Sequence, residues 1–296
     1  MSYQQCLRAA RERLAAVPRR TIEIPPYGTV EYADDGHGMA ALVSHPLFGG
    51  FDLGLAIGRK WLGPDLRIIG PSRFGYLGST LPRAASPADQ ADAFIALLDM
   101  VGLDQVVVLG YSAGGPPVIQ LALSYPDRVL ALVLVASALP GAAGAPPPKL
   151  VANLLIGSDL VFWLLGLAGP SLTARVLGMD KHFRPVGSQC DSIQDAWTSL
   201  FPIAPRRRGA LHDLYVSNPD VQGYPLEAIT VPTLIISARD DAMSAYGNAE
   251  RAALRIPGSR LESFDHGGHL LLDQDVSVRR SVAMFVEGAT AAHQET

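Results

Sequence analysis

The stretch that decides the fold is Gln105-Val-Val-Val-Leu109, followed directly by Gly110-Tyr-Ser-Ala-Gly114. The first five residues form an apolar run without alternation, which is typical of a strand buried on both faces of a sheet. The next five match the pattern G-x-S-x-G, and a helical pattern begins at Ala113. A strand, this pentapeptide and a helix in direct succession indicate a nucleophile elbow, a sharp turn that exposes a serine hydroxyl between small residues. We therefore expect Ser112 to be a nucleophile rather than an ordinary helix cap.

Similar apolar runs occur on either side of this stretch, with helical segments between them. This alternation indicates a doubly wound α/β fold with a mostly parallel sheet flanked by helices. Near the N-terminus, Thr21–Ile24 and Thr29–Tyr32 alternate with period two around Pro25-Pro26 and predict an antiparallel hairpin at a sheet edge. The other expected strands are Met39–Val43, Leu66–Ile69, Val129–Ala136, Thr233–Ser237 and Arg260–Phe264. The expected helices are Phe51–Leu62, Pro87–Val101, Ala113–Tyr125, Ala245–Arg255 and Val276–Val286.

The alternation is interrupted once, between residues 141 and 230. This segment of about 90 residues has no convincing strand and is too long for a structureless loop in a compact domain. We expect residues 1–140 and 231–296 to form the α/β core and residues 141–230 a helical insertion. A short amphipathic helix from Tyr3 to Leu14 should lean on the body of the protein. The helices expected in the insertion are Leu150–Gly166, Ser171–Leu177, Ser192–Leu200 and Arg207–Val216.

The composition excludes several classes of protein. Hydrophobic residues make up 48% of the 296 residues and charged residues only 18%, which argues against intrinsic disorder and against a long coiled coil. The net charge of −4 provides no basic field for phosphates, so we expect no nucleic-acid partner.

A few residues indicate the cellular compartment of the protein and whether the chain spans a membrane. Cys6 and Cys190 are read as free thiols of a reducing compartment, and the first residues lack an apolar signal region, so a cytoplasmic protein is expected. Leu150–Leu167 is strongly apolar, but Gly157-Ser158-Asp159 interrupts it. Because an ionised aspartate is costly inside a bilayer, we expect a buried helix there and no membrane span.

A serine hydroxyl is a weak nucleophile that needs a base, and the base needs an orienting acid. With a nucleophile elbow the chain order is serine, acid, histidine. Asp241 and His269 follow the expected strands Thr233–Ser237 and Arg260–Phe264, so both should emerge at the carboxyl edge of the sheet. Their neighbours Asp240 and His266 remain alternatives for the two roles.

Bound groups are not indicated by the sequence. The pair His266-x-x-His269 has no third ligand at a suitable spacing, so we expect no metal. Neither a dinucleotide fingerprint after a strand nor a P-loop is present, and no cofactor is expected.

An oxyanion hole needs backbone N–H groups aimed at the developing negative charge. We expect one from Ala113, directly after the nucleophile, and one from the loop that begins at His45-Pro46. Pro46 has no N–H, so Leu47 is the candidate donor. His45 is more readily explained as a structural residue beneath this loop than as a catalytic one. Candidates for lining the substrate pocket are His45, Phe48, Tyr111, Phe162 and Trp163.

Taken together, these features resemble the α/β-hydrolase superfamily from Thr21 to about Gly288. Members usually carry His-Gly where this chain has His45-Pro46, and many carry aspartate where it has Ser72. Neither departure affects Ser112, Asp241 or His269. The resemblance implies that the helical insertion is a cap over the active site. The matching features, in order, are His45 with Gly49-Gly50, the segment Pro71–Ser79, the elbow at Ser112, Tyr125–Val129, Pro232–Ile236 with Asp241, and Gly268-His269.

The resemblance also narrows the chemistry. Serine at the elbow disfavours haloalkane dehalogenases and epoxide hydrolases, which use aspartate there, and dienelactone hydrolases, which use cysteine. It implies a serine esterase that cleaves a carboxylic ester through an acyl-enzyme on Ser112. The insertion is rich in leucine and valine and carries Phe162-Trp163, which indicates a small apolar substrate. A lactonase, a hydrolase of a carbon–carbon bond next to a ketone, and a ligand receptor that retains the triad are the alternatives. The sequence does not indicate an oligomeric state.

Overall fold

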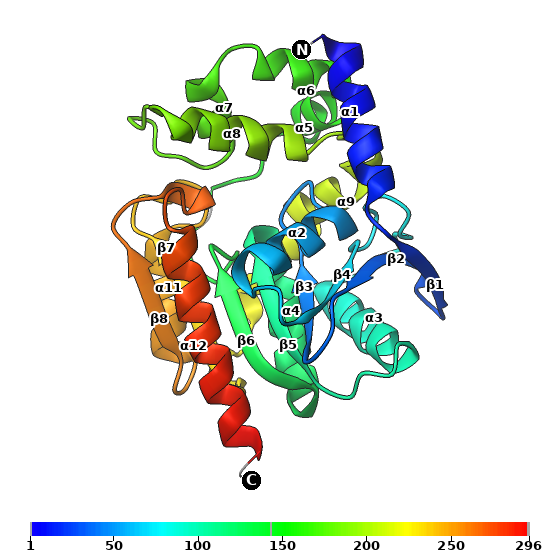
Figure 1. Ribbon diagram of the computed structural model, residues 1–296, viewed down its shortest axis with the longest axis vertical. Helices are drawn as coiled ribbons and strands as arrows, with labels where there is room; N and C mark the ends of the chain where they lie inside the picture. The colour runs from blue at the N-terminus through cyan, green and yellow to red at the C-terminus, as the bar shows by residue number, and fades with distance from the viewer. Residues whose placement is uncertain (1, 143, 295–296) are drawn as a thin grey trace.

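The computed structural model describes residues 2–142 and 144–294 and is built on one eight-stranded sheet (Figure 1). The strand order is β1-β2-β4-β3-β5-β6-β7-β8; strands β3 to β8 run parallel, and β2 is antiparallel to both of its neighbours. The strands are β1 (Arg20–Ile24), β2 (Gly28–Asp35), β3 (Ala40–Ser44), β4 (Arg67–Pro71), β5 (Val106–Tyr111), β6 (Val129–Val135), β7 (Thr233–Ala238) and β8 (Arg260–Phe264). The expected α/β fold, including its edge hairpin, is confirmed.

Helices cover both faces of this sheet. On one face lie α2 (Phe51–Trp61) and α12 (Asp275–Gln294), the latter longer than expected. On the other face lie α3 (Pro87–Met100), α4 (Gly115–Ser124) and α11 (Tyr246–Arg255). The apolar residues of the strands are therefore buried on both sides of the sheet.

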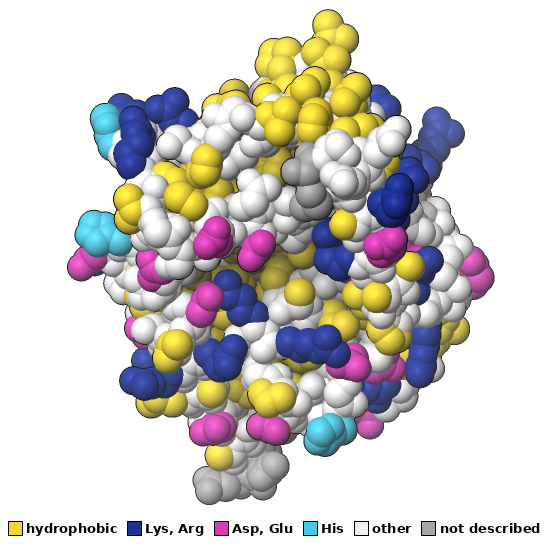
Figure 2. Space-filling model, turned by 45° about the horizontal axis from the view of Figure 1, so that its top comes forward, with side chains coloured by type: hydrophobic (Ala, Val, Ile, Leu, Met, Phe, Trp, Pro, Cys, Tyr) yellow, Lys and Arg dark blue, Asp and Glu magenta, His cyan; other side chains and the backbone are white. Residues whose placement is uncertain are grey.

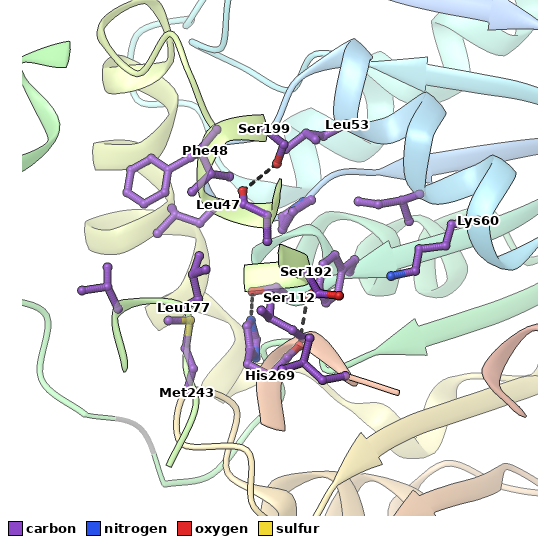
Figure 3. Close-up of a pocket in the computed structure, with 18 of the residues that line it drawn as sticks. Leu47, Phe48, Leu53, Lys60, Ser112, Leu177, Ser192, Ser199, Met243 and His269 are labelled. Atoms are coloured by element: carbon purple, nitrogen blue, oxygen red, sulfur yellow. Dashed lines mark hydrogen bonds between the residues drawn. The ribbon is translucent and has the colours of Figure 1, made fainter. Parts of the chain in front are cut away.

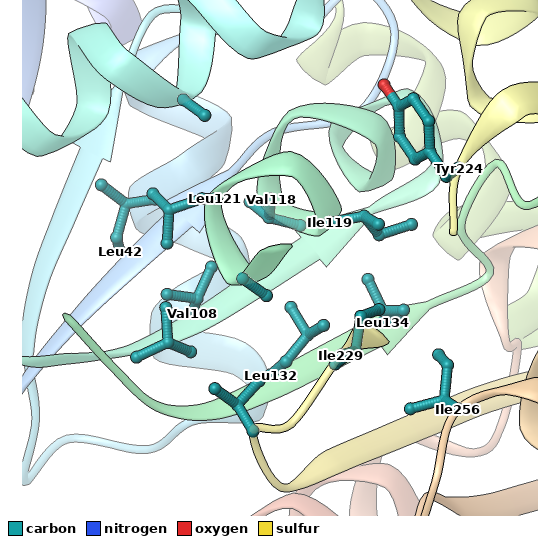
Figure 4. Packing of buried hydrophobic residues seen from close by; sticks show 14 of the residues in the cluster. Leu42, Val108, Val118, Ile119, Leu121, Leu132, Leu134, Tyr224, Ile229 and Ile256 are labelled. Carbon is teal, nitrogen blue, oxygen red and sulfur yellow. The ribbon is translucent and has the colours of Figure 1, made fainter. Parts of the chain in front are cut away.

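Strand β5 explains why the apolar run that precedes the elbow does not alternate. Val106 and Val108 pack toward α3 and α4, in the cluster drawn in Figure 4. Val107 and Leu109 point to the opposite face and join the cluster of α2 and α12. Because successive side chains of a strand point to opposite faces, a strand covered on both sides must be apolar at every position.

The insertion begins with four helices that lie beyond the ends of the strands, on the side of the sheet where the elbow is (Figure 1). They are α5 (Lys149–Ile156), α6 (Asp159–Gly166), α7 (Pro170–Val176) and α8 (Ser188–Ser199). The single helix expected over Leu150–Gly166 is wrong, since α5 and α6 meet at an angle of 82°. Ser158 caps α6 by accepting a hydrogen bond from the Val161 N–H, and the Asp159 carboxylate accepts from the Ile203 N–H. These side-chain bonds to the backbone favour a new helix start over continuation.

The rest of the insertion returns along the core. Helix α9 (Arg207–His212) is shorter than the expected Arg207–Val216, because a π-helical turn at Asp213–Ser217 follows it. The short helix α10 (Asn218–Asp220) comes next. Val221 and Ile229 then pack in the same cluster as α4. The last part of the expected insertion therefore belongs to the main core by its contacts.

The N-terminal helix α1 (Tyr3–Ala16) packs on the insertion rather than only on the α/β core. Cys6 and Ala10 are buried in one cluster with Trp197 of α8. Arg13 donates hydrogen bonds to the carbonyl oxygens of Ser199 and Phe201. Helix α1 therefore stabilises the position of α6 and α8 of the insertion.

Two buried ion pairs join the insertion to the core. Arg206 binds Asp52 of α2 through two hydrogen bonds of 3.0 and 2.7 Å, and Arg73 binds Asp213 through two of 2.6 and 2.7 Å. All four side chains are at most 5% exposed. Removal of one partner from such a pair costs about 3–5 kcal/mol, because a buried charge is left unpaired. The base of the insertion is thus held in one position relative to the sheet.

No single helix among residues 2–142 and 144–294 is long and apolar enough to cross a membrane; the bent pair α5 and α6 passes that test only when both helices are counted together.

Candidate active site

Ser112 lies in a turn between β5 and α4 and has a left-handed backbone, with φ +53°. This conformation is strained for a residue with a side chain and persists only where the surroundings enforce it. The turn passes so close to the end of β3 that a Cβ at Gly114 would clash with the Ser44 carbonyl oxygen. The Ser112 carbonyl accepts a hydrogen bond from the Ala138 N–H at 2.9 Å. The elbow is therefore fixed by its neighbours and presents the serine hydroxyl at the carboxyl edge of the sheet.

Three of the predicted site residues meet at this edge. His269 Nε2 lies 2.9 Å from Ser112 Oγ (Figure 3). His269 Nδ1 lies 2.9 Å from Asp241 Oδ2. The other carboxylate oxygen of Asp241 accepts from the N–H groups of Met243 and Ser244, both at 2.8 Å. The carboxylate is thus held by three hydrogen bonds and fixes the imidazole in one orientation.

The two alternatives, Asp240 and His266, lie elsewhere. Asp240 Oδ1 accepts a hydrogen bond from the Gly268 N–H at 2.8 Å and so shapes the loop that carries His269. The His266 side chain is 89% exposed and lies 4.0 Å from Asp240. Of the four candidates, only Asp241 and His269 are in line with Ser112.

The loop after β3 forms a tight turn, closed by a 3.0 Å hydrogen bond from the Gly49 N–H to the Pro46 carbonyl. Phe48 within the turn has φ +60°. The closing bond does not use the N–H of Leu47, which lies in the same turn and lines the cavity beside Ser112. The turn therefore places Leu47, which carries the predicted second donor, at the cavity that Ser112 also lines.

His45 lies beneath this turn and does not line the cavity, contrary to the pocket position expected from the sequence. Its Nδ1 donates to the Pro46 carbonyl at 2.8 Å, and its Nε2 accepts from the Arg73 N–H at 3.0 Å. These two bonds require the neutral imidazole with its proton on Nδ1. Complete burial, aided by the nearby Arg73 charge, lowers the pKa of His45 well below its ordinary value.

A cavity of about 300 Å³ opens over Ser112, between the core and the insertion (Figure 3). Its walls are mostly apolar, and one end carries the ion pair of Lys60 with Asp275, whose Nζ and Oδ1 are 2.8 Å apart. The core contributes Leu47, Phe48, Leu53, Ile57, Trp61 and Tyr111, and the insertion contributes Phe162, Val176, Leu177, Ala196 and Leu200.

The adjacent aromatic residues of α6 have different positions. Phe162 lines the cavity and stacks on Trp197, with ring centroids 3.9 Å apart. Trp163 does not line the cavity; it packs against Tyr3 of α1, with centroids 5.9 Å apart. The pocket role expected for Trp163 is therefore wrong, because the rotation of α6 turns this side chain toward α1.

Tyr111 lines the cavity as expected and also supports the histidine. Its hydroxyl donates to the His269 carbonyl at 2.9 Å, and its ring stacks on the imidazole at 5.7 Å. Burial raises the pKa of the Tyr111 phenol, which therefore remains a neutral donor.

Gly178, in the insertion, contacts both loops of the site and was not identified from the sequence. Its carbonyl accepts from the Ala242 N–H at 3.1 Å and from the His269 N–H at 3.4 Å. A Cβ at Gly178 would lie 2.6 Å from the His269 Cβ, so only glycine fits this contact. No motif marks the residue, since its position follows from the way the insertion folds back.

Within the described residues, no group of three or more His, Cys, Asp or Glu side chains is arranged to hold a metal ion.

Comparisons with known proteins agree on the fold. Residues 37–165 match a family model described as alpha/beta hydrolase fold. A 2-hydroxymuconate semialdehyde hydrolase from Pseudomonas putida is 29% identical over 238 residues, which cover 77% of this chain and 79% of that protein. An alpha/beta hydrolase fold protein from Nakamurella multipartita superposes with a TM-score of 0.77 at 28% identity, covering 92% of this chain and 100% of the other. The enol-lactonase from Burkholderia xenovorans LB400 has a TM-score of 0.69 at 16% identity, covering 90% and 100%, and shows likeness of fold alone.

The depressed pKa of His45 makes a prediction about stability. Below pH 6.5 the unfolded chain takes up a proton at this residue and the folded chain does not, so stability falls as the pH falls. In urea unfolding at a series of pH values, His45→Asn should remove a slope of up to about 1.4 kcal/mol per pH unit below that value. The exposed His37→Asn is the control and should keep the wild-type slope. An unchanged slope in His45→Asn would refute this assignment.

Proposed function

We propose that this chain, which belongs to the α/β-hydrolase superfamily, is a serine hydrolase that cleaves a carboxylic ester of a small apolar substrate. The observation that carries the proposal is the pair of 2.9 Å contacts that set His269 between Ser112 and Asp241. A nucleophile in contact with a base, and a base held by a buried acid, is the arrangement that acyl transfer through a serine requires.

In the first half of the reaction, Ser112 Oγ attacks the carbonyl carbon of the ester while His269 Nε2 takes the hydroxyl proton. Asp241 stabilises the imidazolium that forms and keeps Nε2 directed at the serine. The negative charge that develops on the carbonyl oxygen is stabilised by the N–H groups of Ala113 and Leu47. Collapse of this intermediate transfers the proton from His269 to the alcohol, which leaves, and the acyl group remains on Ser112.

In the second half, His269 takes a proton from a water molecule that attacks the acyl-enzyme. The same two N–H groups stabilise the second intermediate, and the proton then returns to Ser112 as the acid leaves. The free enzyme is restored with no change of oxidation state, so these steps need no further reactant.

The cavity supports the substrate class. Its walls around Ser112 are formed mainly by leucine, valine, isoleucine and aromatic side chains from both the core and the insertion. Such walls gain free energy when they bury an apolar acyl or alkyl group. A cavity of about 300 Å³ lies at the lower end of the range for small-molecule pockets, which suits a small ester.

A second candidate is hydrolysis of a carbon–carbon bond next to a ketone. It is favoured by the 29% identity to a protein named as a hydrolase of a semialdehyde rather than of an ester. The two functions are distinguished by comparing kcat/KM for p-nitrophenyl esters with that for 2-hydroxymuconate semialdehyde. A protein that turns over only the semialdehyde would overturn the ester proposal, and a single slow turnover of every substrate would indicate a receptor.

The role of Ser112 is tested by Ser112→Ala. This variant should fold normally and lose p-nitrophenyl butyrate hydrolysis by about a thousandfold or more, because no other group can form the acyl-enzyme. Ser124→Ala, an exposed serine on α4, is the matched control and should retain wild-type activity. Turnover close to wild type in folded Ser112→Ala would exclude the proposed nucleophile.

The acyl pocket is tested by two neighbouring substitutions on α6. Phe162→Ala enlarges the cavity and should raise the ratio of kcat/KM for the octanoate over the acetate ester about tenfold or more. Trp163→Ala removes an aromatic ring that faces α1, so it should leave this ratio unchanged. If Phe162→Ala and Trp163→Ala have the same ratio of kcat/KM for the octanoate over the acetate ester, α6 does not form the wall that contacts the acyl group.

A further inference from the structure

The outer face of the insertion exposes an unusual number of large hydrophobic side chains. Ten of the sixteen such side chains exposed among the described residues fall between residues 150 and 186, on α5, α6, α7 and the loop that follows. We call these ten the apolar cap face. Its members are Leu150, Val151, Leu154, Leu155, Leu160, Leu164, Leu167, Leu172, Val176 and Val186.

The buried residues of the same helices show that this face is not needed to hold the insertion together. Helix α5 is anchored by Ala152 and Ile156, and α6 by Phe162, all of which are buried. Leu150 and Leu154 remain 83% and 65% exposed on the opposite side of α5. A large exposed patch of apolar side chains of this kind marks a site where the protein binds an apolar partner.

Basic side chains border the apolar cap face. In Figure 2, hydrophobic side chains gather at the top of the molecule, with Lys and Arg side chains on both sides of them. Residues 149–184 contain four Lys or Arg and two Asp, whereas the whole chain has a net charge of −4. Arg175, Lys181 and Arg184 are exposed, and the Asp159 carboxylate is engaged by the backbone of Ile203. Residues 149–184 therefore carry a net positive charge, although the net charge of the whole chain is negative.

The apolar cap face and the substrate cavity share one residue, Val176. Val176 is 42% exposed at the end of α7 and also lines the cavity, as does Met243, which is 49% exposed. Phe162 lines the cavity from the inner side of α6. Val176 therefore belongs both to the apolar cap face and to the wall of the cavity that holds Ser112.

We propose that the apolar cap face docks on an anionic lipid bilayer. Its leucine side chains enter the boundary between headgroups and acyl chains, and the bordering lysine and arginine side chains bind the anionic headgroups. The helices lie along the surface, because α5 and α6 have eight residues each and meet at 82°, whereas a span needs about 20 residues. In a symmetric dimer through this face, the basic border of one copy would lie against that of the other, and the like charges would repel. Docking on an anionic bilayer instead pairs the basic side chains with negative charges.

The docking itself is independent of the reaction, but its use rests on the proposed function. A docked enzyme would take its ester directly from the lipid layer, so the substrate class would be a lipid-soluble ester with a short apolar acyl or alkyl group.

The docking is tested by flotation of the full-length protein with vesicles. The protein should float with vesicles of phosphatidylcholine and phosphatidylglycerol, and much less with phosphatidylcholine alone. The double variant Leu154→Ser/Leu164→Ser should lower the bound fraction at limiting lipid about tenfold or more, because two apolar side chains no longer leave water. The control Leu254→Ser/Val276→Ser changes residues that are 88% and 74% exposed outside the apolar cap face, and it should bind like wild type.

The basic border is tested separately by Lys181→Glu/Arg184→Glu, which should lose binding to the anionic vesicles, and by the exposed Arg83→Glu, which should not. Melting curves are to establish whether each variant is folded, and vesicle binding is measured whether or not an ester is hydrolysed. Absence of binding to both kinds of vesicle, or equal binding by all variants, would overturn the proposal. A dimer in sedimentation that Leu154→Ser/Leu164→Ser dissociates, without vesicle binding, would also overturn it and assign the face to a second copy.

Discussion

The left-handed backbone at Ser112 is the constraint on which the site depends. A residue with a side chain adopts it at a cost of about 1–3 kcal/mol, and only where packing leaves no alternative. That packing comes from β5, whose Val106 to Leu109 are buried on both faces of the sheet, and from the contact of Gly114 with Ser44. The free energy of packing in the core thus offsets the cost of the strained backbone at Ser112. The hydroxyl is thereby held at the carboxyl edge of the sheet.

The partners of that hydroxyl are held by a second set of contacts that includes the insertion. Asp240 organises the loop of His269 from the core side, and Gly178 contacts the same loop from the insertion. The buried pairs Arg206–Asp52 and Arg73–Asp213 keep the insertion in place. The insertion therefore forms part of the wall of the cavity and part of the support of the proposed base.

What could be predicted from the sequence follows from local physics. The buried strands could be located because both of their faces are covered, and the elbow could be located because a tight turn demands small residues. The sequence predicts one helix over Leu150–Gly166, because the apolar pattern resumes directly after Gly157-Ser158-Asp159. The structure divides it, because Ser158 caps a new helix and the Asp159 carboxylate accepts a hydrogen bond from the distant Ile203 N–H. The roles of Phe162 and Trp163 differ through the rotation of one helix in its tertiary setting, which periodicity alone does not specify.

Ser112 is proposed to be a nucleophile that His269 activates. The most direct measurement is mass spectrometry of the protein after reaction with a fluorophosphonate, which forms a covalent bond with activated serines. If His269 activates Ser112, one adduct per chain should form on the peptide that contains Ser112, and His269→Gln should react much more slowly. An adduct on a different residue, or labelling of Ser112 at the same rate without the imidazole, would contradict it.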